Sequence, residues 1–216
     1  MLETKVANSY GAYYFDGEKS EIHQSRKGDL YTYTAFIGSH SVDVEEGDSL
    51  IYLSEDLNTA HWTANGRQDS QHLAVRLRGY NAGEKSMGII SNTNLPYVNG
   101  CSTRQIFPPE RAGDPTFQQL TLPPFTSEQA HHIHSTVRVV YVLRGYGWSI
   151  VGQKNETEKT ELRPGMVCLL DPMSPHHFET ADEWLTVLPV HVFSSTGAQE
   201  FNHPMFNGTH LMNQGE

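Results

Sequence analysis

The pattern of apolar and polar positions along the chain predicts strands rather than helices. Short runs rich in β-branched and aromatic residues alternate with polar positions, and clusters of Pro, Gly, Asn and Asp separate them. Almost no stretch has the apolar spacing of an amphipathic helix. We expect strands near 31–37, 47–53, 73–78, 117–122, 138–144, 147–151, 159–162, 166–170, 177–180 and 184–193. This succession of short strands indicates an antiparallel all-β sandwich or barrel.

Turn residues divide the chain into three parts. Prolines and glycines recur from 91 to 124, and a stretch of this kind indicates a connection between two halves, which would be either a functional loop or an arm that pairs two subunits. We therefore expect an N-terminal β region over 1–114, a barrel core over 115–193 and a C-terminal tail over 194–216.

A cluster of histidines stands where one of these strands begins. His131, His132 and His134 come directly before an apolar run. Because successive side chains of an extended chain point to opposite faces, His132 and His134 should share one face, with His131 on the other. Two imidazoles on one face can bind one metal ion. The alternatives are a polar loop that is rich in histidine by chance and a bulge that turns His131 toward the ion as well.

A second segment delivers another histidine from a turn. Gly165 follows a proline and precedes the apolar strand at 166–170, and Asp-Pro and Ser-Pro steps mark the turn before His176. Together the two segments resemble the paired motifs of the cupin superfamily, a β-barrel that usually holds one metal ion. Gly165 and His176 stand at the spacing of the second motif, although Asp171 and Met173 occupy its proline and second glycine slots. The resemblance covers about residues 115 to 193.

The first motif is matched except at its glutamate. His132, His134 and Gly145 stand in register, and Arg138 occupies the glutamate slot. A guanidinium cannot replace a carboxylate ligand, because it has no free lone pair and stays protonated. The resemblance therefore implies a cupin-type antiparallel jelly-roll barrel with a three-histidine site made of His132, His134 and His176.

This variant of the motif is similar to that of the three-histidine cupin dioxygenases. The resemblance implies one divalent transition metal, with Fe first and Ni, Zn, Mn or Cu as alternatives, and a small anionic or chelating organic substrate together with O₂. A homodimer is expected by analogy with other cupins. Two alternatives remain open: a lyase or isomerase that uses Zn or Ni, and a module that binds a small molecule without catalysis. The region 1–114 is either a degenerate first cupin half or an unrelated β region.

Three more residues are candidates for catalytic roles. Arg138, if it points into the barrel, would bind a carboxylate or phosphate; if it points outward, it is a solvated strand residue. His191 lies on a strand that lines the barrel in this fold, so it is a fourth ligand, a general base, a substrate contact or a core histidine. Tyr141 is a candidate for proton transfer, with barrel packing as the alternative. His177 should face away from His176.

Composition narrows the classes of partner. The chain has 216 residues and a formal net charge of −10, with no cluster of Lys and Arg, so nucleic-acid binding is not expected. No apolar stretch reaches the length of a membrane span, and the first residues lack the pattern of a signal peptide, which leads us to expect a cytoplasmic protein without a membrane partner. The two cysteines, Cys101 and Cys168, lie far apart and predict no disulfide framework.

Overall fold

The structure is a computed structural model, and it describes residues 9–24, 31–111, 113–193 and 209–211. Strands dominate these ranges, and the only helical element among them is a short 3₁₀ helix, η1 (Val98–Gly100). All strand pairings are antiparallel. The predicted all-β class is therefore confirmed. The predicted C-terminal tail lies outside the described residues, apart from 209–211.

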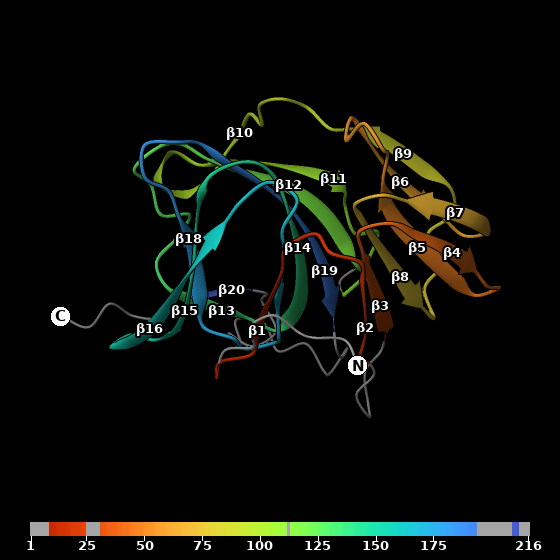
Figure 1. The fold of residues 1–216 in the computed structure, drawn as a ribbon, viewed down its shortest axis with the longest axis horizontal. Helices are drawn as coiled ribbons and strands as arrows, with labels where there is room; N and C mark the ends of the chain where they lie inside the picture. Colours follow the sequence, from red (N-terminus) through yellow and green to blue (C-terminus); the bar gives the residue numbers. More distant parts are fainter. Residues whose placement is uncertain (1–8, 25–30, 112, 194–208, 212–216) are drawn as a thin grey trace.

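Two sheets are formed by the N-terminal part of the chain, on the right of Figure 1. The larger has six strands in the order β2 (Ser20–Gln24), β3 (Thr32–Ile37), β8 (Leu73–Arg78), β5 (Asp48–Leu53), β6 (Thr59–Thr63) and β9 (Lys85–Gly88). The smaller pairs β4 (His40–Val44) with β7 (Gly66–Ser70).

The other two sheets form the barrel on the left of Figure 1. One has seven strands in the order β1 (Ala12–Phe15), β17 (Val167–Leu170), β14 (Thr136–Gly145), β19 (Leu185–Phe193), β12 (Thr116–Leu122), β11 (Ser102–Phe107) and β10 (Leu95–Pro96). The other has five strands in the order β16 (Glu156–Leu162), β15 (Gly147–Gln153), β18 (His176–Glu179), β13 (His132–His134) and β20 (Thr209–Leu211).

The buried apolar residues fill three separate spaces between these sheets. One cluster lies between the β4–β7 pair and the six-stranded sheet. The largest cluster joins the six-stranded to the seven-stranded sheet. A third lies inside the barrel, between the seven-stranded and five-stranded sheets. The seven-stranded sheet is therefore covered on both faces, which explains why its central strands read as nearly continuous apolar runs.

Strand β14 shows how the alternation of side chains assigns residues to these two faces. Val139 and Tyr141 belong to the cluster shared with the N-terminal half, whereas Val140 and Val142 belong to the cluster inside the barrel. Arg138 has the same parity as Val140, so it points into the barrel. At the end of the strand, Gly145 has φ +80°, and a Cβ atom there would overlap the carbonyl oxygen of Trp184. The closing glycine of the first motif is thus required by close backbone approach.

The barrel sheet draws on strands from outside the range predicted for the core. All ten predicted strands are present, with ends shifted by a few residues. However, β1, β10 and β11 come from the region assigned to the N-terminal part. Strand β1 pairs with β17, β11 pairs with β12, and β10 pairs with β11. The Pro-rich stretch at 91–124 therefore contributes two further strands to the barrel. In the described part of the chain, no helix is long and apolar enough to cross a membrane.

Candidate metal centre and pocket

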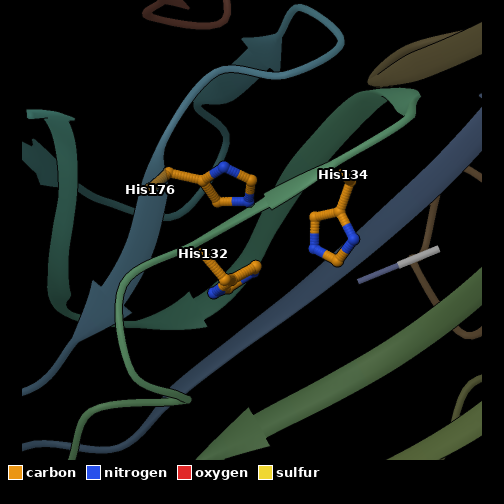
Figure 2. Close-up of side chains that lie close together, drawn as sticks. All are labelled: His132, His134 and His176. Carbon is orange, nitrogen blue, oxygen red and sulfur yellow. The ribbon is translucent and has the colours of Figure 1, made fainter. Parts of the chain in front are cut away.

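The structure brings the three predicted ligands together on the inner wall of the barrel. His132 and His134 lie on β13 and are buried, whereas Ile133 between them turns to the other face. Strand β18 pairs with β13 so that His176 stands directly opposite His132. The ring centroids lie 4.6 Å apart for His132 and His134, 4.6 Å for His132 and His176, and 5.3 Å for His134 and His176. Figure 2 shows the three rings turned toward one space.

The donor atoms of this group fit a single ion. One nitrogen from each of the three imidazoles lies within 4.8 Å of the other two, and this is the only such group of three potential metal-ligating side chains among the described residues. Two donors of the same ion, each about 2.0–2.1 Å from it, are separated by about 3–4 Å. A small contraction of the group would therefore place a transition metal between the three rings.

Backbone carbonyls fix the orientation of two of these rings. His132 Nδ1 lies 3.0 Å from the carbonyl oxygen of Ala130, and His176 Nδ1 lies 2.7 Å from that of Ser174. Because a carbonyl only accepts hydrogen bonds, each Nδ1 must carry the proton, which leaves the Nε2 lone pair of both rings as the ligand atom. His132 Nε2 makes no hydrogen bond to any described residue.

Burial keeps the three imidazoles neutral. Desolvation, together with the nearby charge of Arg138, lowers the pKa of His132 to about 3. Desolvation likewise lowers the pKa of His134 and His176 well below the usual value of histidine. Neutral imidazole is the form that binds metal. The three imidazoles are therefore in the form that can bind a metal ion throughout the neutral pH range.

These depressed pKa values predict a pH-dependent stability of the metal-free protein. As the pH falls below 6.5, unfolded chains bind protons at three histidines that the folded chain does not protonate until far lower pH, so the folded state loses stability. Glu128, whose folded pKa is raised to about 7, acts in the opposite sense between pH 7 and 4.5. The pKa of His191 is held far below the usual value as well, so four histidines outweigh one carboxyl group, and we expect a net loss of at least about 1.4 kcal/mol per pH unit between pH 6.5 and 5.

Urea unfolding at pH 7.5, 6.0 and 5.0 measures this loss. Removing the opposing group in Glu128→Gln should make the fall steeper, because the variant keeps the histidines and lacks the carboxyl group that gains a proton on folding. A free energy of unfolding that stays constant from pH 7.5 to 5.0 would show that the histidines are not held neutral.

A pocket of about 310 Å³ opens beside the histidines. Its floor is the inner face of β11, β12, β14 and β19, and its walls include His134 and Phe178. The polar residues that line it are Tyr97, Thr103, Gln105, Gln118, Glu128, His134, Thr136, Arg138 and His191. Its volume is at the lower end of the range for small-molecule sites, so it fits a small polar ligand.

Two of the three predicted catalytic residues line this pocket. Arg138 is 9% exposed, and its Nη1 lies 3.3 Å from Nε2 of His176. Burial lowers the pKa of Arg138 to about 10, so the guanidinium remains charged at neutral pH. His191 pairs with Arg138 across β14 and β19. The Nε2 atom of His191 has no hydrogen-bond partner in the described ranges, and burial holds its pKa far below the usual value.

Tyr141 does not lie in the pocket, and its assignment to the site is corrected here. It stands three positions after Arg138, so the alternation along β14 turns it to the opposite face of the sheet. There it is buried in the cluster shared with the N-terminal half, and its hydroxyl lies 3.3 Å from Nδ1 of His72. Tyr141 is therefore a packing residue of the contact between the two halves.

The other two histidines of the motifs lie away from the ligand group. Nδ1 of His131 lies 2.8 Å from Nδ1 of His177. On its other side, Nε2 of His177 lies 2.9 Å from Oε1 of Glu179. One of the two Nδ1 atoms must carry the proton in this contact. As the alternation predicts, His131 and His177 point to the face of the sheet opposite His132 and His176.

Glu128 and Tyr97 also line the pocket, and sequence reasoning missed both. Glu128 is 3% exposed, and its Oε1 lies 3.6 Å from Nε2 of His132. Tyr97 accepts a hydrogen bond from Nε2 of Gln129, the residue after Glu128. The sequence signal for Glu128 was a lone carboxylate a few residues before the histidine pair, whereas the family motif places its glutamate after the pair. Tyr97 lay in the stretch interpreted as a connection.

The jelly-roll barrel, with histidines from two such motifs on its inner wall, has the fold and the arrangement of histidines that are typical of the cupin superfamily. Residues 126–189 match the family model of the AraC-like ligand binding domain. This segment contains all three histidines of the candidate metal centre.

Comparison with solved structures shows the same fold over most of the chain. The protein Ylba from E. coli is similar with a TM-score of 0.59 and 12% identity, over 92% of this chain and 97% of that one. Vicilin from hazelnut, Corylus avellana, is similar with a TM-score of 0.50 and 8% identity, over 89% of this chain and 83% of vicilin. A search of curated proteins found no match. The likeness to Ylba and vicilin extends over both halves of the chain, and at these identities it concerns the fold alone.

Proposed function

We propose that the protein is a metal-dependent cupin enzyme, a non-haem Fe(II)-type dioxygenase that acts on a small anionic or chelating organic substrate. One observation carries the proposal: three neutral imidazoles, two of them oriented by backbone carbonyls, meet beside a pocket that is lined by His134 and the buried cation Arg138. Fe(II) held by His132, His134 and His176 would supply the redox and Lewis-acid chemistry for oxygen insertion.

The residues of the chain bind and orient the substrate in this proposal. Arg138 offers charged N–H donors inside the pocket, where an anionic group pairs with them more strongly than in water. The amides of Gln105 and Gln118, which face each other across β11 and β12, offer neutral hydrogen bonds at the other side of the pocket floor. Substrate carboxylate at Arg138 and a polar group at the two glutamines would fix the substrate beside the histidines.

A lyase or isomerase using Zn or Ni is the second candidate. The observation that favours it is His191, a neutral imidazole in the pocket whose Nε2 has no hydrogen-bond partner in the described part of the chain. Such a nitrogen can accept a proton from a substrate that the metal polarises. The third candidate is a non-catalytic binding module, and the match of 126–189 to a ligand-binding domain family favours it. The homodimer and the cytoplasmic location stay predictions.

Two measurements separate these candidates. Metal analysis comes first, and retention of about one equivalent of a transition metal after reconstitution is expected for both enzymes. Oxygen consumption by the Fe(II)-loaded protein over a panel of thiols, diketones and hydroxy or aromatic acids then tests the dioxygenase. Uptake that requires both substrate and iron supports it. Turnover without oxygen uptake would indicate the lyase, and metal-independent ligand binding without turnover would indicate the binding module.

A further inference from the structure

A carboxylate is buried beside the candidate metal centre. Glu128 comes from the segment that precedes β13, and its backbone N–H donates to the carbonyl oxygen of Phe178 on β18 at 3.0 Å. This bond ties the segment to β18, the strand that carries His176. The side chain of Glu128 is 3% exposed and lines the pocket together with His134 and Arg138.

The position of this carboxylate suits a shared ion. Oε1 of Glu128 lies 3.6 Å from Nε2 of His132, the lone-pair nitrogen that the Ala130 carbonyl leaves free. Two ligands of one transition metal, with metal–nitrogen and metal–oxygen distances of about 2.0–2.2 Å, stand about 3.0–3.5 Å apart when adjacent in the coordination shell. The observed separation is therefore close to that of two neighbouring ligands.

The second carboxylate oxygen of Glu128, Oε2, is left without a hydrogen-bond partner among the described residues. The lack of a partner is costly for a buried carboxylate. Its burial raises the pKa of Glu128 to about 7, with Arg138 acting in the opposite direction. A divalent ion bound next to Arg138 would be repelled by the positive charge of the guanidinium. A negatively charged carboxylate ligand would offset part of this repulsion.

From these contacts we propose that Glu128 is the fourth protein ligand of the metal, supplied from the segment before the histidine pair instead of from the motif slot that Arg138 occupies. The inference rests on the proposed three-histidine metal centre. Glu128 is not among the side chains whose donor atoms all lie within 4.8 Å of one another, so ligation includes a rotation of its carboxylate toward the histidines. Because Oε2 makes no hydrogen bond to a described residue, the rotation breaks none at that oxygen. The pocket cation Arg138 then remains available for the substrate.

Metal titration of variants tests this assignment without reference to activity. Chelator-treated protein is titrated with Co(II), and the visible absorption and the dissociation constant are recorded for the wild type, Glu128→Gln and Glu179→Gln. Glu179→Gln is the matched control, since it removes a carboxylate that contacts His177 on the opposite face of the sheet. We expect Glu128→Gln to weaken Co(II) binding at least about tenfold and to shift the absorption band, with no change in the control.

The outcomes distinguish this inference from the proposed function. If the wild type binds no metal, the three-histidine centre itself is wrong. If the wild type binds and Glu128→Gln binds with the same affinity and the same spectrum, Glu128 is not a ligand. A structure of the metal-loaded wild type decides the matter if Glu128→Gln does not fold: a Glu128 oxygen within about 2.2 Å of the ion supports the proposal, and a distance beyond about 3 Å overturns it.

Discussion

Replacing His132 and His176 together with alanine is expected to abolish metal retention, leaving less than about a tenth of an equivalent bound after reconstitution and desalting. The two rings supply two of the three nitrogen donors, and they come from facing positions on β13 and β18. The imidazole of His134, even with the carboxylate of Glu128 beside it, leaves too few donors to hold a divalent ion against buffer and water. Metal content per folded chain, measured by elemental analysis, checks the result.

The chain offers a matched control for this double variant. His131→Ala with His177→Ala removes the two histidines that stand next to His132 and His176 in the sequence but point to the opposite face. We expect this control to retain metal like the wild type. Circular dichroism of both variants separates loss of the site from loss of the fold. Normal metal content in the variant at 132 and 176, or loss of metal in the control, would contradict the assignment of the ligands.

Arg138→Met is expected to have the second large effect: it should strengthen metal binding and weaken the binding of an anion. Methionine has a similar length but no charge, so the repulsion between the guanidinium and the divalent ion disappears. The donor that now lies 3.3 Å from Nε2 of His176 disappears as well. We expect metal affinity to rise at least about tenfold. Binding of an anion to the metal-loaded protein should fall about a hundredfold, because a charge-assisted contact is worth about 1.5–3 kcal/mol.

Oxalate is a suitable anionic probe, since its binding to the Co(II)-loaded protein can be followed by visible absorption. Arg144→Met is the matched control: it lies on the same strand, but it is exposed and donates to the carbonyl oxygens of Ile90 and Ser91. It should leave both affinities unchanged. Unchanged oxalate affinity in Arg138→Met would mean that Arg138 does not contact the anion. Weaker metal binding in that variant would mean that the guanidinium supports the ligand group instead of repelling the ion.

The sequence predicted the fold and the ligand group because both follow from local patterns. Alternation along the strands and turn residues between them define the β elements, and motif spacing places His132, His134 and His176 at matching positions. The orientation of Arg138 follows from the alternation of side chains along β14, once it is known which face of the strand points into the barrel. Tyr141 stands an odd number of positions from Arg138, so the same alternation turns it away from the pocket.

The parts of the pocket that the sequence did not predict depend on contacts between segments that lie far apart in the chain. Glu128 lies outside the strands, and nothing in its neighbourhood shows that the segment folds over β18. Tyr97 reaches the pocket only because β10 and β11 extend the barrel sheet beyond β12, in a stretch whose prolines and glycines predicted a connection. Pairing of β1 with β17 joins residues from opposite ends of the chain. Such pairings are set by the tertiary fold and leave no local signal.

The most direct test of the metal centre is a crystal structure of the metal-loaded protein with anomalous diffraction data collected at the absorption edge of the metal. The account predicts one strong anomalous peak inside the barrel, within about 2.0–2.3 Å of a ring nitrogen from each of His132, His134 and His176. The absence of an anomalous peak at these rings in metal-treated protein, with the guanidinium of Arg138 still in contact with Nε2 of His176, would contradict the proposed metal centre.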